Sequence, residues 1–447
     1  MATAKKEEKF QPHDYATYLL SSKKWRSDRN MLFKWVETHW SVINKQEDSE
    51  ADAYAWLVAK KPSHISPENA KRAVKAACLH LPALDDVALT SVIVPCKNGY
   101  VHMPAVGTGA PVLLPANPDL NVRHSLAVSY DASAPSAPLF EKFIRRALPD
   151  DDVRGRVQEY IGYTLLPDAR HQKAQLWLGE GANGKGVLAN VVQKLHGIVA
   201  AVQLQRLDGF NLEAIVGSSL IYVDEVPRGK FDEQMVKSLI AGERVPVTRK
   251  WQSTISLRLH GKWIVCGNHI PTVTDHSVGF WRRWDLVPFG ETIPERERDP
   301  LLLDKILFGE MPAVLNWALA GLQRLLDRGG FKPELPHPMA DLLHGARTDS
   351  NSIQAWMQDV RICLAPGGAT PTRKTSIYTH YRDWCIANGL QAFSSTKWLQ
   401  FLETQYQNRI IQKRQRGKGD KNPDWYINIV FEESLEFASL DLEFCNA

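Results

Sequence analysis

One short segment constrains the fold of this chain more than any other. The apolar run Gln175–Leu178 leads directly into residues 179–186, which read G-E-G-A-N-G-K-G, and helical periodicity follows at Val187–Leu195. Strand, glycine-rich loop and helix in this order satisfy the pattern G-x-x-x-x-G-K. The glycines allow the loop to curl until several backbone N–H groups converge on one anion, and the helix contributes its positive end. The segment therefore predicts a phosphate-binding loop within an α/β fold.

The loop also predicts how a nucleoside triphosphate would be held. Lys185 supplies a point charge for the β and γ phosphates, whereas Gly186 replaces the usual Ser or Thr that binds Mg²⁺ through its hydroxyl. A chance glycine-rich turn is the alternative interpretation. The residues that we expect to contact the nucleotide are Gly179, Gly181, Ala182, Asn183, Gly184, Lys185, Gly186 and Val187.

Two further apolar runs end in polar residues. Leu220–Val223 runs into Asp224 and Glu225, and Trp263–Cys266 runs into Gly267 and Asn268. Short runs without alternation are typical of parallel strands buried on both faces, and ligand sites collect at the carboxyl ends of such strands.

These polar residues predict a catalytic constellation. We expect Asp224 to hold Mg²⁺, Glu225 to orient and deprotonate the attacking water, and Asn268 to contact that water and the γ phosphate. Taken singly, solvated acids at a strand end and an ordinary turn asparagine are the competing interpretations.

Composition narrows the class of protein only broadly. A chain of 447 residues predicts about two to four domains. A net charge of +4 permits nucleic-acid binding without arguing for it, so any such surface must be local. The six cysteines form no C-x-x-C pair, which argues against a zinc ribbon. No apolar stretch has the length of a membrane span or the features of a signal peptide, so we expect a soluble, cytoplasmic protein.

Four motifs, taken in order and spacing, resemble the superfamily III DNA helicases of the AAA+ class, in particular the primase-helicases of poxviruses, phages and plasmids. They read G-A-N-G-K, I-Y-V-D-E, I-V-C-G-N-H-I-P and F-W-R-R-W-D-L-V-P-F. The resemblance implies a hexameric ring around DNA, ATP bound between subunits and 3′ to 5′ translocation.

The resemblance also implies roles for basic residues that act across a subunit interface. Either Arg282 or Arg283 would be the arginine finger that neutralises charge on the transferring phosphoryl group, and Lys237 would be a second basic residue at that interface. A surface arginine pair packed on tryptophan rings, and a solvated helix lysine, are the alternatives.

Two basic surfaces would contact DNA. Segment 245–257 resembles a hairpin that projects into the ring channel, with Arg249, Lys250 and Trp251 at its tip, although many solvated hairpin tips are basic. The C-terminal part resembles a winged helix, a fold that also mediates protein contacts. Its recognition helix would be Ser395–Thr404. The basic residues expected on this domain are Lys397, Lys413, Arg414, Arg416 and Lys418.

We therefore expect an α/β chain whose P-loop AAA+ motor has a parallel sheet. The expected regions are an N-terminal accessory region, helical and then β, at 1–135, a helical collar at 136–170, the helicase core at 171–290, a helical lid and linker at 291–345, the winged helix at 346–431 and an acidic tail at 432–447. Within the first region, periodicity predicts helices at Asp14–Leu20, Arg29–Trp40 and Pro67–His80, and a turn signal predicts a hairpin of Ser91–Val94 with Gly99–His102.

The expected function is that of an ATP-dependent DNA helicase in the replication of a phage, plasmid or integrated mobile element. Its cofactors would be ATP and Mg²⁺, and its partners single-stranded and forked DNA and further copies of itself. Because no zinc-ligand cluster or acidic triad for polymerisation is evident, a primase would be a separate protein. The alternatives are an AAA+ remodelling ATPase and an origin-binding initiator with a vestigial nucleotide site, which Gly186 favours.

Overall fold

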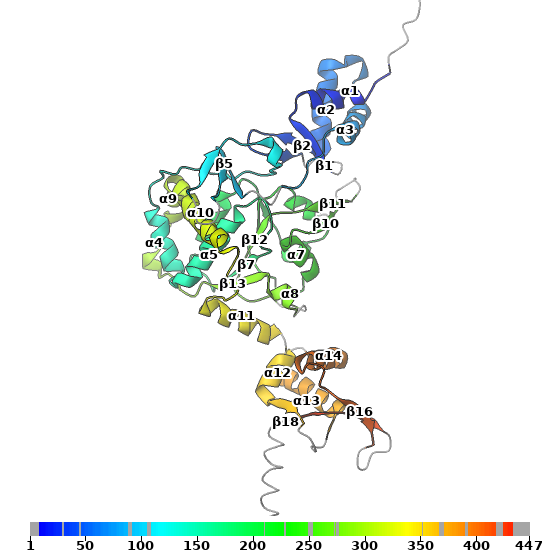
Figure 1. Cartoon of the computed structure of the whole chain (residues 1–447), viewed down its shortest axis with the longest axis vertical. Coiled ribbons are helices and arrows are strands. Elements are labelled where there is room, and N and C mark those ends of the chain that lie inside the picture. The colour runs from blue at the N-terminus through cyan, green and yellow to red at the C-terminus, as the bar shows by residue number, and fades with distance from the viewer. Residues whose placement is uncertain are drawn as a thin grey trace, which may run out of the picture. The chain divides into compact units, whose positions relative to one another are not determined.

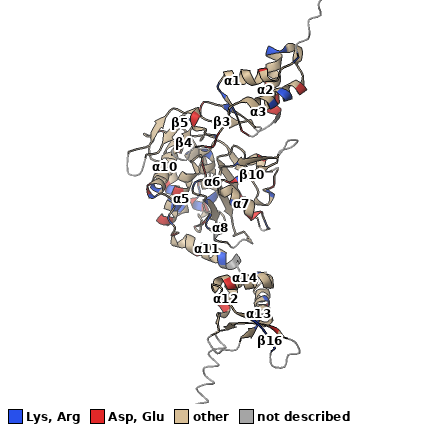
Figure 2. Cartoon of the chain, turned by 45° about the vertical axis from the view of Figure 1, so that its right-hand side comes forward, with Lys and Arg blue, Asp and Glu red and all other residues tan. Residues whose placement is uncertain are grey.

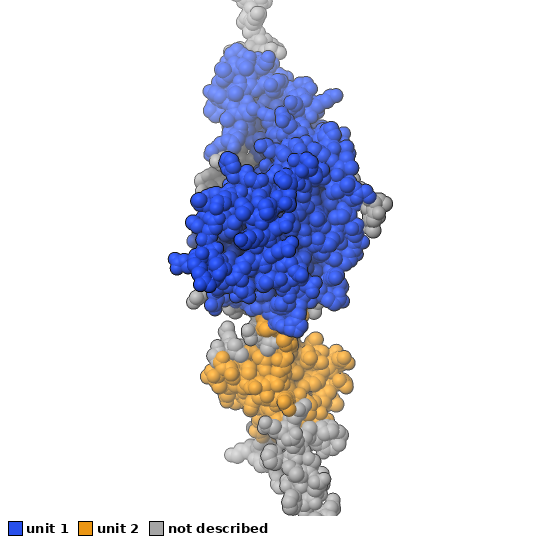
Figure 3. All heavy atoms as spheres, turned by 90° about the vertical axis from the view of Figure 1, so that its left-hand side faces the viewer, with its two compact units in different colours: residues 1–342 blue, residues 343–447 orange. Residues whose placement is uncertain are grey.

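The computed structural model describes residues 9–431 except 29–30, 44–45, 88–91, 105–108, 210, 228, 249–253, 272, 274–276, 351, 366–370, 389–391 and 417–422. The chain divides into two compact units, Met1–Leu342 and Leu343–Ala447, which Figure 3 colours separately. Within the described residues, no helix is both long and apolar enough to cross a lipid bilayer.

A five-stranded parallel sheet forms the centre of the first unit. In spatial order its strands are β13 (Trp284–Pro288), β7 (Ala174–Leu178), β12 (Lys262–Gly267), β9 (Leu220–Val223) and β8 (Val199–Ala201). Every residue of β7 and β12 is buried, as expected for strands covered on both faces. The predicted parallel sheet is confirmed, and the three apolar runs of the sequence are its three middle strands.

Helices cover both faces of this sheet. In Figure 1, α4 (Pro138–Ala147), α5 (Asp151–Thr164), α9 (Leu302–Gly309) and α10 (Met311–Arg328) lie to one side of the strands, with α7 (Glu233–Ile240) on the other. Helices α5 and α10 approach closely at two glycines, because a Cβ on Gly162 would stand 2.5 Å from the carbonyl oxygen of Ala318, and one on Gly321 equally near that of Gln158. The apolar periodicity of Met311–Leu326 predicts a helix, and α10 confirms it.

The remaining elements of this unit are short. Helix α6 (Lys185–Leu195) follows β7, and strands β10 (Arg244–Val247) and β11 (Ile255–Arg258) form a separate antiparallel pair. Helix α8 spans Val278–Trp281. Single 3₁₀ turns occur at Pro62–His64, Pro118–Leu120, Leu204–Arg206, Asn211–Ile215 and Glu295–Glu297.

The N-terminal part contains more β structure than the sequence predicts. It comprises α1 (His13–Ser21), β1 (Trp25–Asp28), β2 (Met31–Trp35), β3 (Trp40–Val42), α2 (Gln46–Lys60), α3 (Pro67–His80), β4 (Ile93–Cys96), β5 (Gly99–His102) and β6 (Val112–Leu114). The predictions of α1, α3 and the β4–β5 hairpin are confirmed.

The prediction of a helix at Arg29–Trp40 is wrong. Strands β2 and β3 occupy this stretch and pair antiparallel, with Trp35 opposite Trp40. Aromatic residues favour pleated, half-buried positions, and here the indole N–H of the buried Trp40 donates to the carbonyl oxygen of Pro118 at 2.8 Å. Tertiary packing therefore decides the conformation against local periodicity.

The second unit has its own core, centred on Trp356, Tyr381 and Trp398. Helix α11 (His337–Ser350) leads into it. Its elements are α12 (Ser352–Val360), β14 (Ile362–Leu364), β15 (Thr372–Arg373), α13 (Lys374–Ala387), α14 (Ser395–Gln405), β16 (Gln412–Gln415), β17 (Asp424–Ile427) and β18 (Ile429–Phe431). The sequence pattern predicts a helix over Ile353–Leu364, but α12 ends at Val360. Arg361 adopts a φ of 45°, and Ile362–Leu364 pairs with β18 instead.

Candidate functional site

The glycine-rich loop curls between the end of β7 and the start of α6. Positive φ values occur at Gly181 (113°), Ala182 (50°) and Gly184 (84°), so the chain reverses sharply before the helix begins at Lys185. A Cβ at position 184 would stand only 2.8 Å from the ring of Phe143 on α4. Glycine is therefore required at 184 both by conformation and by the close approach of the neighbouring helix.

Asn183 anchors the loop from inside. This side chain is only 3% exposed, and its Nδ2 donates to the carbonyl oxygen of Phe289 at 3.0 Å while its Oδ1 accepts from the backbone N–H of Lys185 at 3.3 Å. The N–H of Ile293 also donates to the carbonyl oxygen of Ala182 at 2.8 Å. The loop is thus fastened to the segment that follows β13. Sequence reasoning placed Asn183 in the loop but did not foresee this anchoring.

The side chain of Lys185 lies across the carboxyl ends of β7 and β12. Its Nζ donates to the carbonyl oxygens of Gly179 and Gly267, each at 2.8 Å, and to Asn268 Oδ1 at 3.2 Å. Burial lowers the pKa of Lys185, whereas Cys266 and Asp224 act in the opposite direction. The structure therefore brings together Lys185 and Asn268, residues 83 positions apart.

The two acids lie at the same edge of the sheet. Asp224 and Glu225 follow β9, which pairs with β12, and both are exposed. The hydroxyl of Tyr222 donates to Asp224 Oδ1 at 2.7 Å, a contact that no local sequence pattern predicts. Burial lowers the pKa of Lys185, and the Asp224 carboxylate opposes that shift, as expected for a charge at the same edge of the sheet. The carboxyl edge thus holds the loop, both acids and Asn268.

Arg282 and Arg283 lie at the opposite edge of the sheet, directly before β13. Arg282 is exposed, and its guanidinium donates to Gln172 Oε1 at 3.2 Å. Arg283 is 9% exposed, and its guanidinium donates to the carbonyl oxygen of Gly279. Since β13 runs parallel to β7 with Pro288 opposite Leu178, the length of β13, about 13 Å, separates the two arginines from the end of the sheet where the loop lies. Neither arginine reaches the glycine-rich loop of its own chain.

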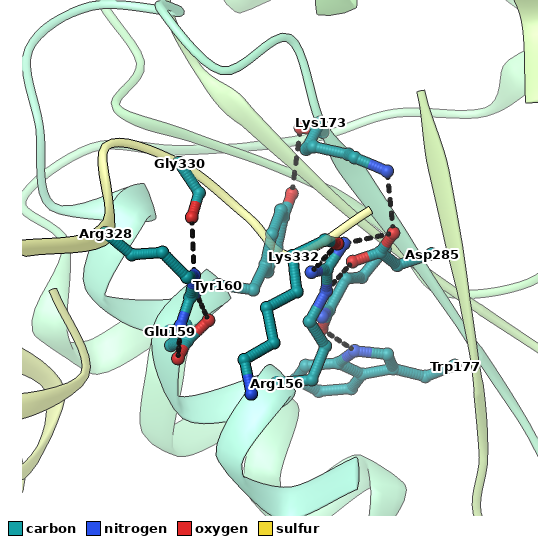
Figure 4. Close-up of polar contacts among 10 residues, drawn as sticks. Arg156, Glu159, Tyr160, Lys173, Trp177, Asp285, Arg328, Gly330 and Lys332 are labelled. Atoms are coloured by element: carbon teal, nitrogen blue, oxygen red, sulfur yellow. Dashed lines mark hydrogen bonds and ion pairs between the residues drawn. The ribbon is translucent and has the colours of Figure 1, made fainter. Parts of the chain in front are cut away.

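A buried ion network fixes the start of β13. Asp285 is fully buried, and its carboxylate accepts from Arg156 at 2.6 and 3.1 Å and from Lys173 Nζ at 2.9 Å (Figure 4). Burial alone would raise the pKa of Asp285, but Lys173 and Arg156 outweigh it and hold the pKa below its ordinary value. Arg156 also donates to the carbonyl oxygen of Lys332 at 2.9 Å. Sequence reasoning missed this network, whose only trace was an acid inside an apolar run.

A cleft of about 600 Å³ opens next to this network, between α5 and α10. Its lining residues include both acids and bases, and both kinds of residue occur along α5 in Figure 2. Arg324 and Arg328 both pair with Glu159, the former at 3.6 Å, and Arg154 pairs with Asp151. Because the basic and acidic side chains of the cleft pair with one another, the cleft is less suited to binding phosphate than the glycine-rich loop.

The other predicted site residues are dispersed. Lys237 lies half-buried on α7. In the second unit, Lys397 is exposed on α14, Lys413 and Arg414 are exposed on β16, and Arg416 follows β16. Four predicted DNA contacts lie outside the described residues: Arg249, Lys250, Trp251 and Lys418.

Comparison with known proteins gives one family match and several structural matches. Residues 177–283 match the model of a family of unknown function (DUF5906), a range that contains the glycine-rich loop, Asp224, Asn268 and Arg282. An apo structure of the C-terminal region of NrS-1 superposes with a TM-score of 0.52 and 11% identity, over 94% of this chain and 100% of that one. A second apo structure of the same region gives a TM-score of 0.50, again with 11% identity, over 95% of this chain and 100% of that one.

The chain shares the fold of the NrS-1 C-terminal region. The match extends over nearly the whole chain and includes both units. Superposition on JCV helicase covers 50% of this chain and 65% of that one at 13% identity, with a TM-score of 0.30 that is too low to establish a common fold.

Proposed function

We propose that this chain is an ATP-dependent DNA helicase that works as a ring of identical subunits. The observation that carries the proposal is the convergence of the glycine-rich loop, Lys185, Asp224, Glu225 and Asn268 at one edge of a parallel sheet. A phosphate-binding loop next to acids at the ends of neighbouring strands is the arrangement that hydrolysis of a γ phosphate requires.

ATP would enter with its phosphates over the loop. Lys185 would exchange its carbonyl partners for the β and γ phosphates, and Glu225 would take a proton from the water that attacks the γ phosphorus. Asp224 offers the carboxylate oxygen that Mg²⁺ prefers, and the bound ion would neutralise phosphate charge. The described residues contain no group of three His, Cys, Asp or Glu side chains able to hold a metal, so phosphates and water would complete its coordination.

A neighbouring subunit would complete the site. Arg282 is the better candidate for the arginine finger, because it is exposed whereas Arg283 is buried. Its position at the far edge of the sheet supports action on the next subunit's nucleotide rather than on its own. Lys237 would be a second basic residue at this interface. Closed rings of like subunits, such as a hexamer, repeat one such contact at every interface.

DNA would pass through the ring and contact two surfaces. Arg249, Lys250 and Trp251, which lie in the sequence between the paired strands β10 and β11, would grip single-stranded DNA. The second unit would act as a winged helix, with Lys397 on α14 and the basic residues of β16 facing phosphates. We place this activity in the replication of a phage, plasmid or integrated mobile element, with any primase as a separate protein.

One feature favours a different function. Gly186 cannot supply the hydroxyl that usually binds Mg²⁺, which would suit an initiator that binds DNA and has lost hydrolysis. A remodelling ATPase without a DNA channel is a further alternative. The three functions differ in whether DNA stimulates hydrolysis and whether hydrolysis separates strands.

The decisive experiment measures ATP hydrolysis and strand displacement by the purified chain on a forked substrate. Single-stranded DNA should stimulate hydrolysis, and Lys185→Ala should reduce hydrolysis by about a hundredfold or more while DNA binding persists. Lys194→Ala is the matched control, because Lys194 is exposed near the other end of the same helix. Hydrolysis indifferent to DNA would favour the remodelling ATPase, and DNA binding without hydrolysis would favour the initiator.

A further inference from the structure

One tryptophan of the second unit, Trp425, lies outside the hydrophobic core. Trp356 and Trp398 are fully buried in its core. The indole N–H of Trp384 donates to Asp359 at 2.6 Å. Trp425, in contrast, is 47% exposed on β17. The exposed part of this large apolar ring contributes little hydrophobic stabilisation to the fold. We therefore consider Trp425 a candidate for contact with a ligand.

Trp425 lies on a short antiparallel ribbon, made of β16 and β17, that carries basic side chains on both faces. Trp425 is directly opposite Arg414, and Tyr426 is directly opposite Lys413. Directly opposed residues share a face, so each face of the ribbon pairs one ring with one cation. On the Tyr426 face, the guanidinium carbon of Arg373 also stands 6.0 Å from the ring centroid.

The two faces differ in how their rings are engaged. Tyr426 already has Arg373 against it, whereas in the part of the chain that the structure describes no ring or cation is stacked on Trp425. Asp424 is the one acid of the ribbon, and its carboxylate pairs with Arg373 at 3.5 Å and accepts from the hydroxyl of Thr375 at 3.4 Å. The face that carries Trp425 therefore presents an open ring beside the exposed cation of Arg414.

An exposed ring beside an exposed cation fits single-stranded nucleic acid. Cations neutralise phosphates whatever the sequence, and an aromatic ring stacks on any base whose face is uncovered. Within a duplex the base faces are covered by their neighbours, and they become accessible where the strands part. A protein partner would match the ring, but only a strongly acidic one would also complement the cations on both faces of the ribbon.

We propose that Trp425 stacks on an unpaired base where duplex and single strands meet, with Arg414 on an adjacent phosphate. The second unit then recognises the junction of a fork rather than duplex alone. This inference rests on the proposed DNA-binding function and assigns a ligand to one face of the ribbon.

The test measures binding of the full chain, without nucleotide, to labelled forked DNA and to blunt duplex. Trp425→Ala should weaken fork binding by about tenfold, within the range of a base–aromatic stack, and leave duplex binding within about twofold. Trp425→Phe should restore most of the lost affinity. Ile411→Ala is the matched control, since Ile411 is 64% exposed next to the same ribbon and cannot stack.

A forked DNA that lacks the base at the junction tests whether Trp425 stacks on that base. The wild-type chain should bind it as weakly as Trp425→Ala binds the intact fork, and the variant should lose nothing further. Equal losses on fork and duplex would overturn the proposal, as would unchanged DNA binding combined with a shift in self-association, which would assign the ring to protein contact. Because the assay uses no ATP, its failure would leave DNA-stimulated hydrolysis and the Lys185→Ala result to decide the helicase proposal.

Discussion

Two glycines of the loop, two positions apart, differ completely in their tolerance for a side chain. Gly184 has a φ of 84°, and an added Cβ would meet the ring of Phe143 at 2.8 Å, whereas Gly186 has open space around it. Gly184→Ala should therefore lower the free energy of unfolding by about 1–3 kcal/mol and abolish ATP binding. Gly186→Ala should fold and melt like the wild type. Thermal melts with titration of an ATP analogue check both, and equal behaviour of the two variants would contradict the geometry.

A buried lysine predicts how stability depends on pH. Lys262, the first residue of β12, is 2% exposed and donates to the carbonyl oxygen of Leu166, and burial lowers its pKa to about 7. Its ordinary pKa is 10.5, so between pH 7 and 10.5 the unfolded chain binds more protons and stability should rise with pH. Below pH 7 both states are protonated and the full penalty of burying the charge remains.

Replacing that lysine by an apolar residue should remove the penalty. Lys262→Met should melt at a higher temperature than the wild type at pH 6.5, and the difference should shrink as the pH approaches 10. Lys305→Met, at an exposed lysine of α9, is the matched control. Melting curves at a series of pH values test this, and a constant difference between variant and wild type would show that the charge of Lys262 is irrelevant.

At the scale of elements, β13 depends on the ion network at its start. Asp285→Asn would leave Arg156 and Lys173 without their buried carboxylate, and such a loss costs about 3–5 kcal/mol. Because Arg282 lies three residues before Asp285, the turnover of ATP should fall while affinity for an ATP analogue at the distant loop persists. Asp304→Asn, at an exposed acid of α9, should change neither. A loss of analogue affinity equal to the loss of turnover would indicate general unfolding instead.

Elements with strong local signals were predictable, and those fixed by distant partners were not. The apolar runs of β7, β9 and β12 identify buried strands because such strands are apolar on both faces. Strand β13 was not predicted, because it contains the charged Asp285. This carboxylate can be buried only because it pairs with Arg156 and Lys173, which lie 129 and 112 positions away in the sequence. Strand β2 was not predicted, because its conformation depends on pairing with β3 rather than on its own periodicity.

The candidate site shows the same division. The loop, the acids after β9 and Asn268 stand out because each follows an apolar run. The anchoring of Asn183 on Phe289 and the hydroxyl of Tyr222 on Asp224 depend on three-dimensional proximity, and no local pattern reports them.

At the scale of the whole molecule, the positions of Lys185 and Arg282 predict complementation between subunits. Arg282→Ala and Lys185→Ala should each be inactive alone. Mixed in equal amounts, they should recover hydrolysis at about a quarter of the interfaces, where an intact loop meets an intact arginine by random assembly. Steady-state hydrolysis across mixing ratios measures this. Absence of recovery at every ratio would contradict a site shared between subunits.

The glycine-rich loop lies at the carboxyl ends of the parallel strands and Arg282 at their amino ends, and this placement has a consequence for how much ATP the protein would consume. Under the proposed function, a solitary chain would hold only half of a hydrolytic centre, so ATP turnover per mole of protein should rise with protein concentration and fall on dilution. Dispersed subunits would then hydrolyse little ATP, and hydrolysis would occur mainly where subunits have assembled on DNA.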